Sequence, residues 1–141
     1  MSWDPTWEQV FRSRQWGKYP PEELIRFMAA YFYNVGERSE TIILDAGCGT
    51  GACLWYVAEE GFDACGIDGS RTAVQLAKMR LRKERLEASV TVGDLVTLPF
   101  REGYFDGVID VAAIQHNMQK SRDRIMREVF RVLKPQGSSF P

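Results

Sequence analysis

Residues 41–52 read Thr41-Ile-Ile-Leu-Asp45-Ala-Gly47-Cys-Gly49-Thr-Gly51-Ala52, a short apolar run that ends in a glycine-rich turn. Residues 52–60 then have the pattern of a helix, which Gly61 is placed to end. Glycine is needed where the backbone takes a positive φ or approaches a ligand closely. The stretch therefore predicts a strand, a turn that approaches a ligand, and a helix.

The rest of the chain repeats this alternation of strand and helix. Further strands are expected over residues 63–68, 89–93 and 105–114, and helices over about 22–34, after Ser70 and after Ser121. Strands that alternate with helices predict an α/β fold with a doubly wound, mostly parallel sheet. Ligands of such sheets bind beyond the carboxyl ends of the strands.

The first 20 residues have a different character. They contain three tryptophans, Trp3, Trp7 and Trp16, in an irregular setting. We expect an aromatic arm over residues 1–20 and the ligand-binding domain over 21–141. Trp16 and Tyr19 are candidates for a lid, with the tyrosine ring facing a cationic ligand. An arm that only covers one side of the sheet is the alternative.

Composition and charge argue against several kinds of function. A net charge of −1 over 141 residues lacks the clustered basic charge of a general nucleic-acid binder. The basic run over residues 78–85 is interpreted as a solvated helix face, with an RNA or acidic protein substrate as the minor alternative. Three cysteines and one histidine predict neither disulfides nor a metal site. Without an apparent signal peptide or membrane span, a cytoplasmic protein is expected.

At least three of four aspartates are expected to line one edge of the sheet. Asp45 lies at the turn, Asp68 ends the second strand, Asp94 follows the third and Asp110 lies within the fourth. The pyrophosphate of a dinucleotide would be repelled there, whereas the sulfonium and ammonium groups of S-adenosylmethionine (SAM) would be attracted. The acidic rim therefore favours SAM.

The glycine turn alone leaves the cofactor open. Gly47, Gly49 and Ala52, with Asp68 further along, also satisfy the G-x-G-x-x-A pattern of dinucleotide-binding folds. An NAD(P)-binding protein is therefore kept as an alternative.

Five ordered motifs together resemble those of the class I SAM-dependent methyltransferases. They span residues 45–51, 66–70, 93–100, 105–110 and 131–137. The resemblance implies that the backbone at Gly47 and Gly49 approaches the methionyl part of SAM, with Asp45 near its ammonium group.

The same resemblance implies roles for the later aspartates. Asp68 would accept hydrogen bonds from the ribose hydroxyls, and Asp94 would contact the adenine amino group. Leu95 would pack or bond through its backbone at the ring, and Asp110 belongs to the fourth-strand motif on the cofactor side. A turn-forming or helix-capping role is the alternative for each aspartate.

Methyl transfer from a sulfonium is an in-line displacement, so the protein mainly positions a methyl acceptor and excludes water. The product would be S-adenosylhomocysteine, and a small-molecule acceptor is expected. His116, in the Gln115-His116-Asn117 segment after the fourth strand, is the candidate proton acceptor. The alternative is a histidine that only hydrogen bonds at the start of a loop.

The resemblance also implies a seven-stranded sheet, whereas only four residues follow Gly137. We therefore expect a C-terminally truncated fold that lacks the last three strands. The fourth strand would then be an exposed edge, open to self-association. A SAM-binding or regulatory fragment without catalysis is the alternative function.

Overall fold

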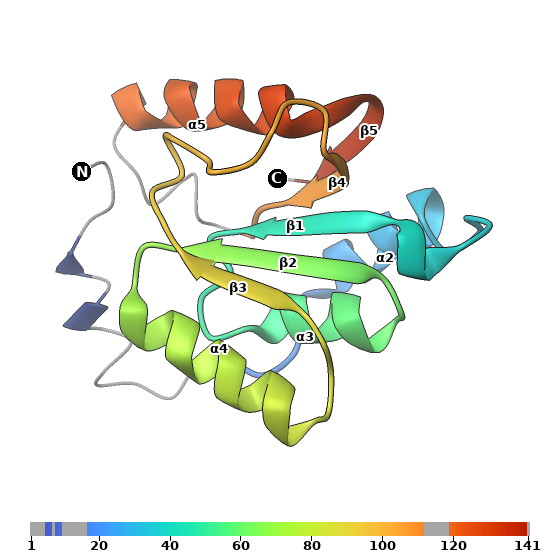
Figure 1. Cartoon of the computed structure of the whole chain (residues 1–141), viewed down its shortest axis with the longest axis horizontal. Helices are drawn as coiled ribbons and strands as arrows, with labels where there is room; N and C mark the ends of the chain where they lie inside the picture. The colour runs from blue at the N-terminus through green and yellow to red at the C-terminus, as the bar shows by residue number, and fades with distance from the viewer. Residues whose placement is uncertain (1–4, 7, 10–16, 112–118, 141) are drawn as a thin grey trace.

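Helices and strands alternate along almost the whole chain. The computed structural model describes residues 5, 6, 8, 9, 17–111 and 119–140. In chain order, and with the labels of Figure 1, the elements are α2 (Glu22–Tyr31), η1 (Arg38–Glu40), β1 (Ile42–Ala46), α3 (Ala52–Glu59), β2 (Asp63–Asp68), α4 (Arg71–Lys83), β3 (Ser89–Val92), β4 (Phe105–Ile109), α5 (Gln119–Val132) and β5 (Leu133–Phe140).

The five strands form one parallel sheet in the order β3-β2-β1-β4-β5. This order confirms the predicted doubly wound α/β fold. β1 lies in the middle, where Leu44 pairs with Cys65 of β2 on one side and with Val108 of β4 on the other. The winding direction changes between β1 and β4, and the crevice at such a change is where ligands bind in open α/β sheets.

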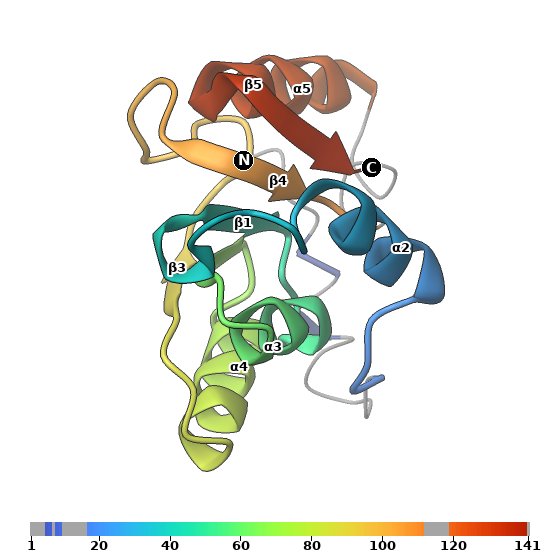
Figure 2. The same ribbon diagram turned by 90° about the vertical axis from the view of Figure 1, so that its right-hand side faces the viewer.

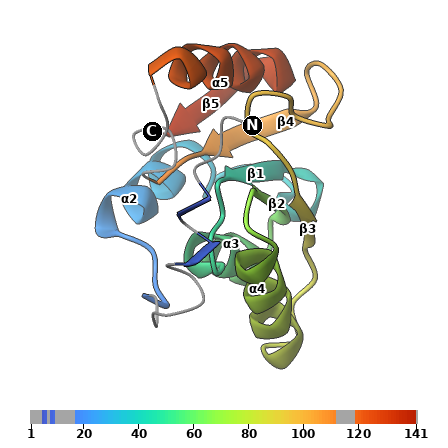
Figure 3. The same ribbon diagram turned by 90° about the vertical axis from the view of Figure 1, so that its left-hand side faces the viewer.

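Helices cover both faces of the sheet. In all three views α5 lies on the face opposite to α3 and α4, and α2 lies on the side of α3 (Figures 1, 2 and 3). Ile43 of β1 packs in the cluster with α2, α3 and α4, whereas its neighbour Leu44 packs in the cluster with α5. Alternate residues of a strand point to opposite faces, so a strand covered on both sides is apolar throughout.

The fifth strand corrects one prediction. We expected no sequence to form it, yet α5 passes directly into β5, which pairs with β4. The prediction was wrong because it placed the fifth strand after Gly137, whereas β5 begins at Leu133 and includes residues 133–137 themselves. A register shift between Phe105 and Gly107 accommodates this segment, and Phe140 then pairs with Ile109. Proline also fits an edge strand, which is the place of β5.

β4 is therefore not an exposed edge. It lies between β1 and β5, and the edges of the described sheet are β3 and β5. The expected self-association through β4 loses its structural basis. In the described part of the chain, no helix is long and apolar enough to cross a bilayer.

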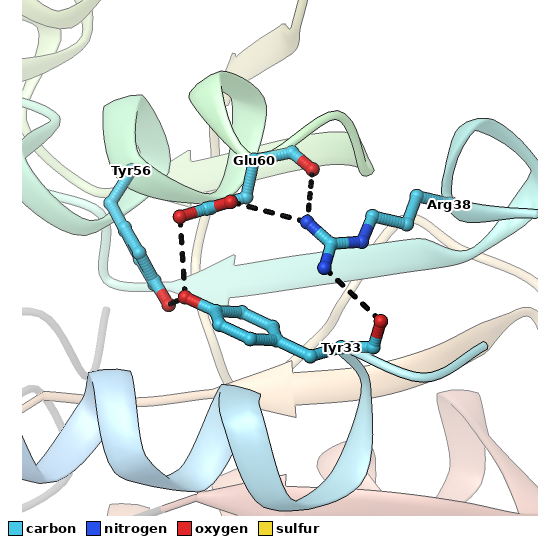
Figure 4. Close-up of polar contacts among 4 residues, drawn as sticks. All are labelled: Tyr33, Arg38, Tyr56 and Glu60. Carbon is cyan, nitrogen blue, oxygen red and sulfur yellow. Dashed lines mark hydrogen bonds and ion pairs between the residues drawn. The ribbon is translucent and has the colours of Figure 1, made fainter.

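A polar network fixes the segment between α2 and β1 to α3 (Figure 4). The Tyr33 hydroxyl lies 2.5 Å from that of Tyr56 and 3.2 Å from Glu60 Oε1. The Arg38 guanidinium donates to Glu60 Oε2 at 3.1 Å and to the Tyr33 carbonyl at 3.1 Å, and lies over the Tyr33 ring. These residues lie next to the starts of β1 and β2, at the amino end of the sheet.

Candidate functional site

The glycine turn joins β1 to α3 at the carboxyl end of the sheet. Gly47, Gly49 and Gly51 have φ values of 77°, 54° and 98°, a region in which side chains with a Cβ are strained. The N–H groups of Gly47 and Cys48 donate to the carbonyl of Ile67 at 2.8 and 3.0 Å. The turn is thus held against the end of β2, and its approach to a ligand stays a prediction.

Asp45 lies inside the protein at this turn. It is 3% exposed, and its Oδ2 has no hydrogen-bond partner among the described residues. The Leu54 N–H, in the first turn of α3, donates to the carboxyl group. Burial, followed by the charges of Asp110 and Asp68, raises the pKa of Asp45 to about 8.

Asp68 ends β2 and bridges two backbone segments. Its Oδ2 accepts the Gly49 N–H and its Oδ1 accepts the Ser70 N–H, both at 2.9 Å. Burial raises the pKa of Asp68, the two N–H groups oppose this, and the nearby Glu8 raises it further. Each carboxylate oxygen can accept more than one hydrogen bond, so Asp68 can also accept a ligand hydroxyl.

Glu8 is a site residue that sequence reasoning missed. Its carboxylate accepts the hydroxyl groups of Ser70 and Thr72 and the Thr72 N–H. Ser70 caps α4 in turn by accepting the Ala73 N–H at 3.0 Å, as predicted for a helix N-cap. Nothing in the local sequence pattern brings Glu8 to α4, because the contact spans more than 60 residues.

Asp110 completes the buried acidic group. It follows directly after β4, which ends at Ile109 rather than at the predicted residue 114, and it is 5% exposed. Its backbone N–H donates to the Phe140 carbonyl at 2.8 Å. The structure therefore brings Asp110 to Asp45, and β5 helps to hold it there.

Asp94 and Leu95 lie in the connection after β3. Asp94 Oδ1 accepts the Val96 N–H at 3.1 Å, which is the turn-forming contact given above as the alternative role. Leu95 is buried in the cluster that α5 covers. Its side chain is therefore occupied in the core.

An ion pair on α5 holds this connection in place. Glu128 Oε1 accepts the Leu98 N–H at 2.8 Å, and Arg131 donates to the carbonyls of Leu98 and Phe100 at 2.9 Å each. The pair itself has an Nε to Oε2 distance of 2.6 Å. In the sequence, Arg131 is the first residue of the motif over residues 131–137. The positive charge of Arg131 at the end of a helical pattern was the one signal in the sequence for these contacts.

The described contacts do not place Tyr19 at the carboxylates. The Tyr19 side chain is 71% exposed, and its ring lies 5.7 Å from that of Trp55 on α3 and within 5.8 Å of the Arg80 guanidinium on α4. A contact of Tyr19 with the cofactor stays a prediction. His116 and Trp16 lie outside the described residues.

The arrangement suits a ligand that carries positive charge and hydroxyl groups. Asp45, Asp68 and Asp110 are each at most 5% exposed at the ends of three neighbouring strands. Oδ2 of Asp45 has no hydrogen-bond partner among the described residues. This atom and the glycine turn beside it fit the amino-acid end of SAM. Among the described residues, no group of three or more histidine, cysteine or acidic side chains is arranged to hold a metal ion.

Fold and site together define a doubly wound α/β protein with a buried acidic group where the winding direction changes. Residues 43–137 match the family described as "Methyltransferase domain". The chain belongs to this methyltransferase family, whose cofactor is SAM, and this agrees with the resemblance of its motifs.

Curated relatives and solved structures support the assignment. The chain is 35% identical over 98 residues to methyltransferase GfsG of Streptomyces halstedii, covering 67% of this chain and 34% of that protein. It is 33% identical over 117 residues to norajmaline N-methyltransferase of Rauvolfia serpentina, covering 81% and 39%. A SAM-dependent methyltransferase of Methanosarcina mazei is similar in structure, with a TM-score of 0.66, 30% identity, and coverage of 77% and 52%. The chain thus spans roughly a third to a half of the length of these proteins.

Proposed function

We propose that this chain binds SAM at the carboxyl end of the sheet and transfers its methyl group to a small-molecule acceptor, leaving S-adenosylhomocysteine. The observation that carries the proposal is the buried group of Asp45, Asp68 and Asp110 beside the glycine turn. Such a group attracts a cation and repels a pyrophosphate, which disfavours NAD(P).

The residues at the turn would hold the amino-acid part and the ribose of SAM. Asp45 would pair with the ammonium group, and the backbone at Gly47 and Gly49 leaves room for close approach. Asp68 would accept the ribose hydroxyls while keeping its bonds to Gly49 and Ser70.

The connection after β3 would hold the adenine end. Asp94 would contact the adenine amino group. Because the Leu95 side chain is in the core, its backbone is the part that would face the ring. The Glu128–Arg131 pair would keep this connection in position.

SAM supplies an activated methyl group on a sulfonium centre, so the chain's own residues mainly orient the two reactants. Transfer is proposed to follow an in-line displacement. The name of the relative from Rauvolfia serpentina refers to norajmaline, which supports a small-molecule acceptor here. His116 is proposed to take a proton from the acceptor.

Calorimetric titration with SAM, S-adenosylhomocysteine and NAD tests the binding half of the proposal. We expect binding of the first two and none of NAD. Asp68→Ala should weaken SAM binding by about 10- to 100-fold, the loss expected for hydrogen bonds to a charged group. Asp63→Asn, at the exposed start of β2, is the matched control and should bind as the wild type does. Binding of NAD without SAM would refute the cofactor assignment.

Release of labelled methyl from SAM across a panel of amine, hydroxyl and thiol acceptors tests the catalytic half. We expect transfer to at least one acceptor, and a lower rate for His116→Ala with an unchanged affinity for SAM. Tight SAM binding without transfer to any acceptor would favour the alternative of a SAM-binding fragment without catalysis.

A further inference from the structure

Three buried carboxyl groups lie at the carboxyl ends of neighbouring strands. Asp45, Asp68 and Asp110 are 3%, 5% and 5% exposed, on neighbouring strands β1, β2 and β4. Asp68 has two backbone N–H donors, whereas Oδ2 of Asp45 has no hydrogen-bond partner among the described residues. Asp45 is therefore less compensated than Asp68.

Among the described residues, the titratable groups that act on Asp45 or are acted on by it are acids. Asp110 faces it from the end of β4 and Asp68 from the end of β2, while the thiols of Cys48 in the turn and Cys53 in α3 are also close. Burial and the charge of Asp45 raise the pKa of both thiols, so neither carries charge near neutral pH.

An ionised Asp45 would be a buried charge whose Oδ2 has no hydrogen-bond partner among the described residues and whose neighbours include two further acids, so burial favours its neutral form. One proton therefore stays in the acidic group of the free protein. Asp45 is its most favourable site: burial and its two acidic neighbours raise its pKa to about 8, with only the Leu54 N–H opposing them.

We propose that the free protein carries a proton on Asp45 and releases it to solvent when the ammonium group of the cofactor binds. The inference rests on the proposed function. In this step the O–H bond of the Asp45 carboxyl group breaks, its electron pair stays on the oxygen, and the proton passes to the buffer. The ligand ammonium then takes the place of the proton beside Oδ2.

The step makes cofactor affinity depend on pH with a definite sign. Below pH 8 the ionised fraction of Asp45 in the free protein falls about tenfold per pH unit. The dissociation constant should therefore rise about tenfold for each unit that the pH falls between about 7.5 and 6. Above about pH 8 it should level off.

Calorimetric titration with S-adenosylhomocysteine at pH 6.5, in two buffers of different ionisation enthalpy, counts the protons released. We expect about one proton per ligand, since Asp45 is almost fully protonated at that pH. The second ligand is 5′-deoxy-5′-methylthioadenosine, which has the nucleoside and the thioether but no ammonium group. It should release none.

Asp45→Asn keeps the acceptor for the Leu54 N–H and removes the titration. This variant should bind S-adenosylhomocysteine without proton release and with an affinity that does not change between pH 6 and 8. Asp63→Asn should behave like the wild type. If Asp45→Asn does not fold, the comparison of the two ligands on the wild type still tests whether binding of the ammonium group releases a proton.

The outcomes separate the two proposals. Binding of S-adenosylhomocysteine without proton release, or with equal release in Asp45→Asn, overturns the proton coupling and leaves the proposed function intact. Failure of the folded wild type to bind either SAM or S-adenosylhomocysteine between pH 6 and 8.5 overturns both.

Discussion

Replacing Asp45 by asparagine removes an ionisable group from the interior while keeping almost the same size and shape. The wild-type carboxyl group has an ordinary pKa of 3.8 when unfolded and about 8 when folded. Between these values the folded state binds one more proton than the unfolded state, so wild-type stability falls as the pH rises. The fall is about 1.4 kcal/mol per pH unit, or about 3 kcal/mol from pH 5 to pH 7.

Asp45→Asn should lack this decrease. The amide adds a pH-independent offset of about 1–3 kcal/mol if its N–H groups stay unpaired, so the slope is diagnostic and the absolute stability is not. Urea denaturation of both proteins at pH 5, 6 and 7 gives the two curves. The difference in the free energy of unfolding should shift by about 3 kcal/mol in favour of the variant over this range. Parallel curves would show that Asp45 is already ionised in the folded protein and would refute the reasoning.

Three further substitutions test the contacts around the site. Glu128→Ala removes the acceptor of the Leu98 N–H and should lower the free energy of unfolding by about 1–3 kcal/mol in urea; an unchanged midpoint would mean that other contacts hold the connection after β3. At Gly107→Ala the new Cβ would lie 2.7 Å from Cζ of Phe32. The cost should be about 1–3 kcal/mol, seen as a lower melting temperature, and a melting temperature equal to that of the wild type would show that α2 moves aside. Tyr33→Phe should cost about 1 kcal/mol in the same assay without changing SAM affinity, and weaker SAM binding would contradict the separation of this network from the site.

Local pattern was enough to predict most of the sheet. The strand, turn and helix of residues 41–60 and the strand at 63–68 follow from short apolar runs and glycine positions, and the structure confirms them. The fifth strand was missed because it was expected to start after Gly137, whereas pairing with β4, a long-range event, includes residues from Leu133 onward in the strand. Strand propensity describes how a residue fits a particular sheet position, which a sequence window does not contain.

The candidate site, like the sheet, was predicted only in part from the sequence. Asp45, Asp68 and Asp110 were found because parallel strands bring their carboxyl ends to one edge. Their degree of burial, and the missing partner of Asp45 Oδ2 among the described residues, depend on α3 and the neighbouring strands and were not accessible from spacing. Glu8 was missed because its contacts with α4 join segments far apart in the chain.

The network of Tyr33, Arg38, Tyr56 and Glu60 has a consequence for how such a protein evolves. It anchors the chain at the end of the sheet where no ligand is proposed to bind, with each of its four residues already hydrogen bonded. The opposite end carries the destabilising carboxyl groups. Most substitutions lower the free energy of unfolding, and folded proteins have only a small excess of it. Stabilising contacts at one end of the sheet therefore allow destabilising substitutions to be tolerated at the other end. New ligand preferences can then be sampled at the turn and its neighbours while the chain stays folded.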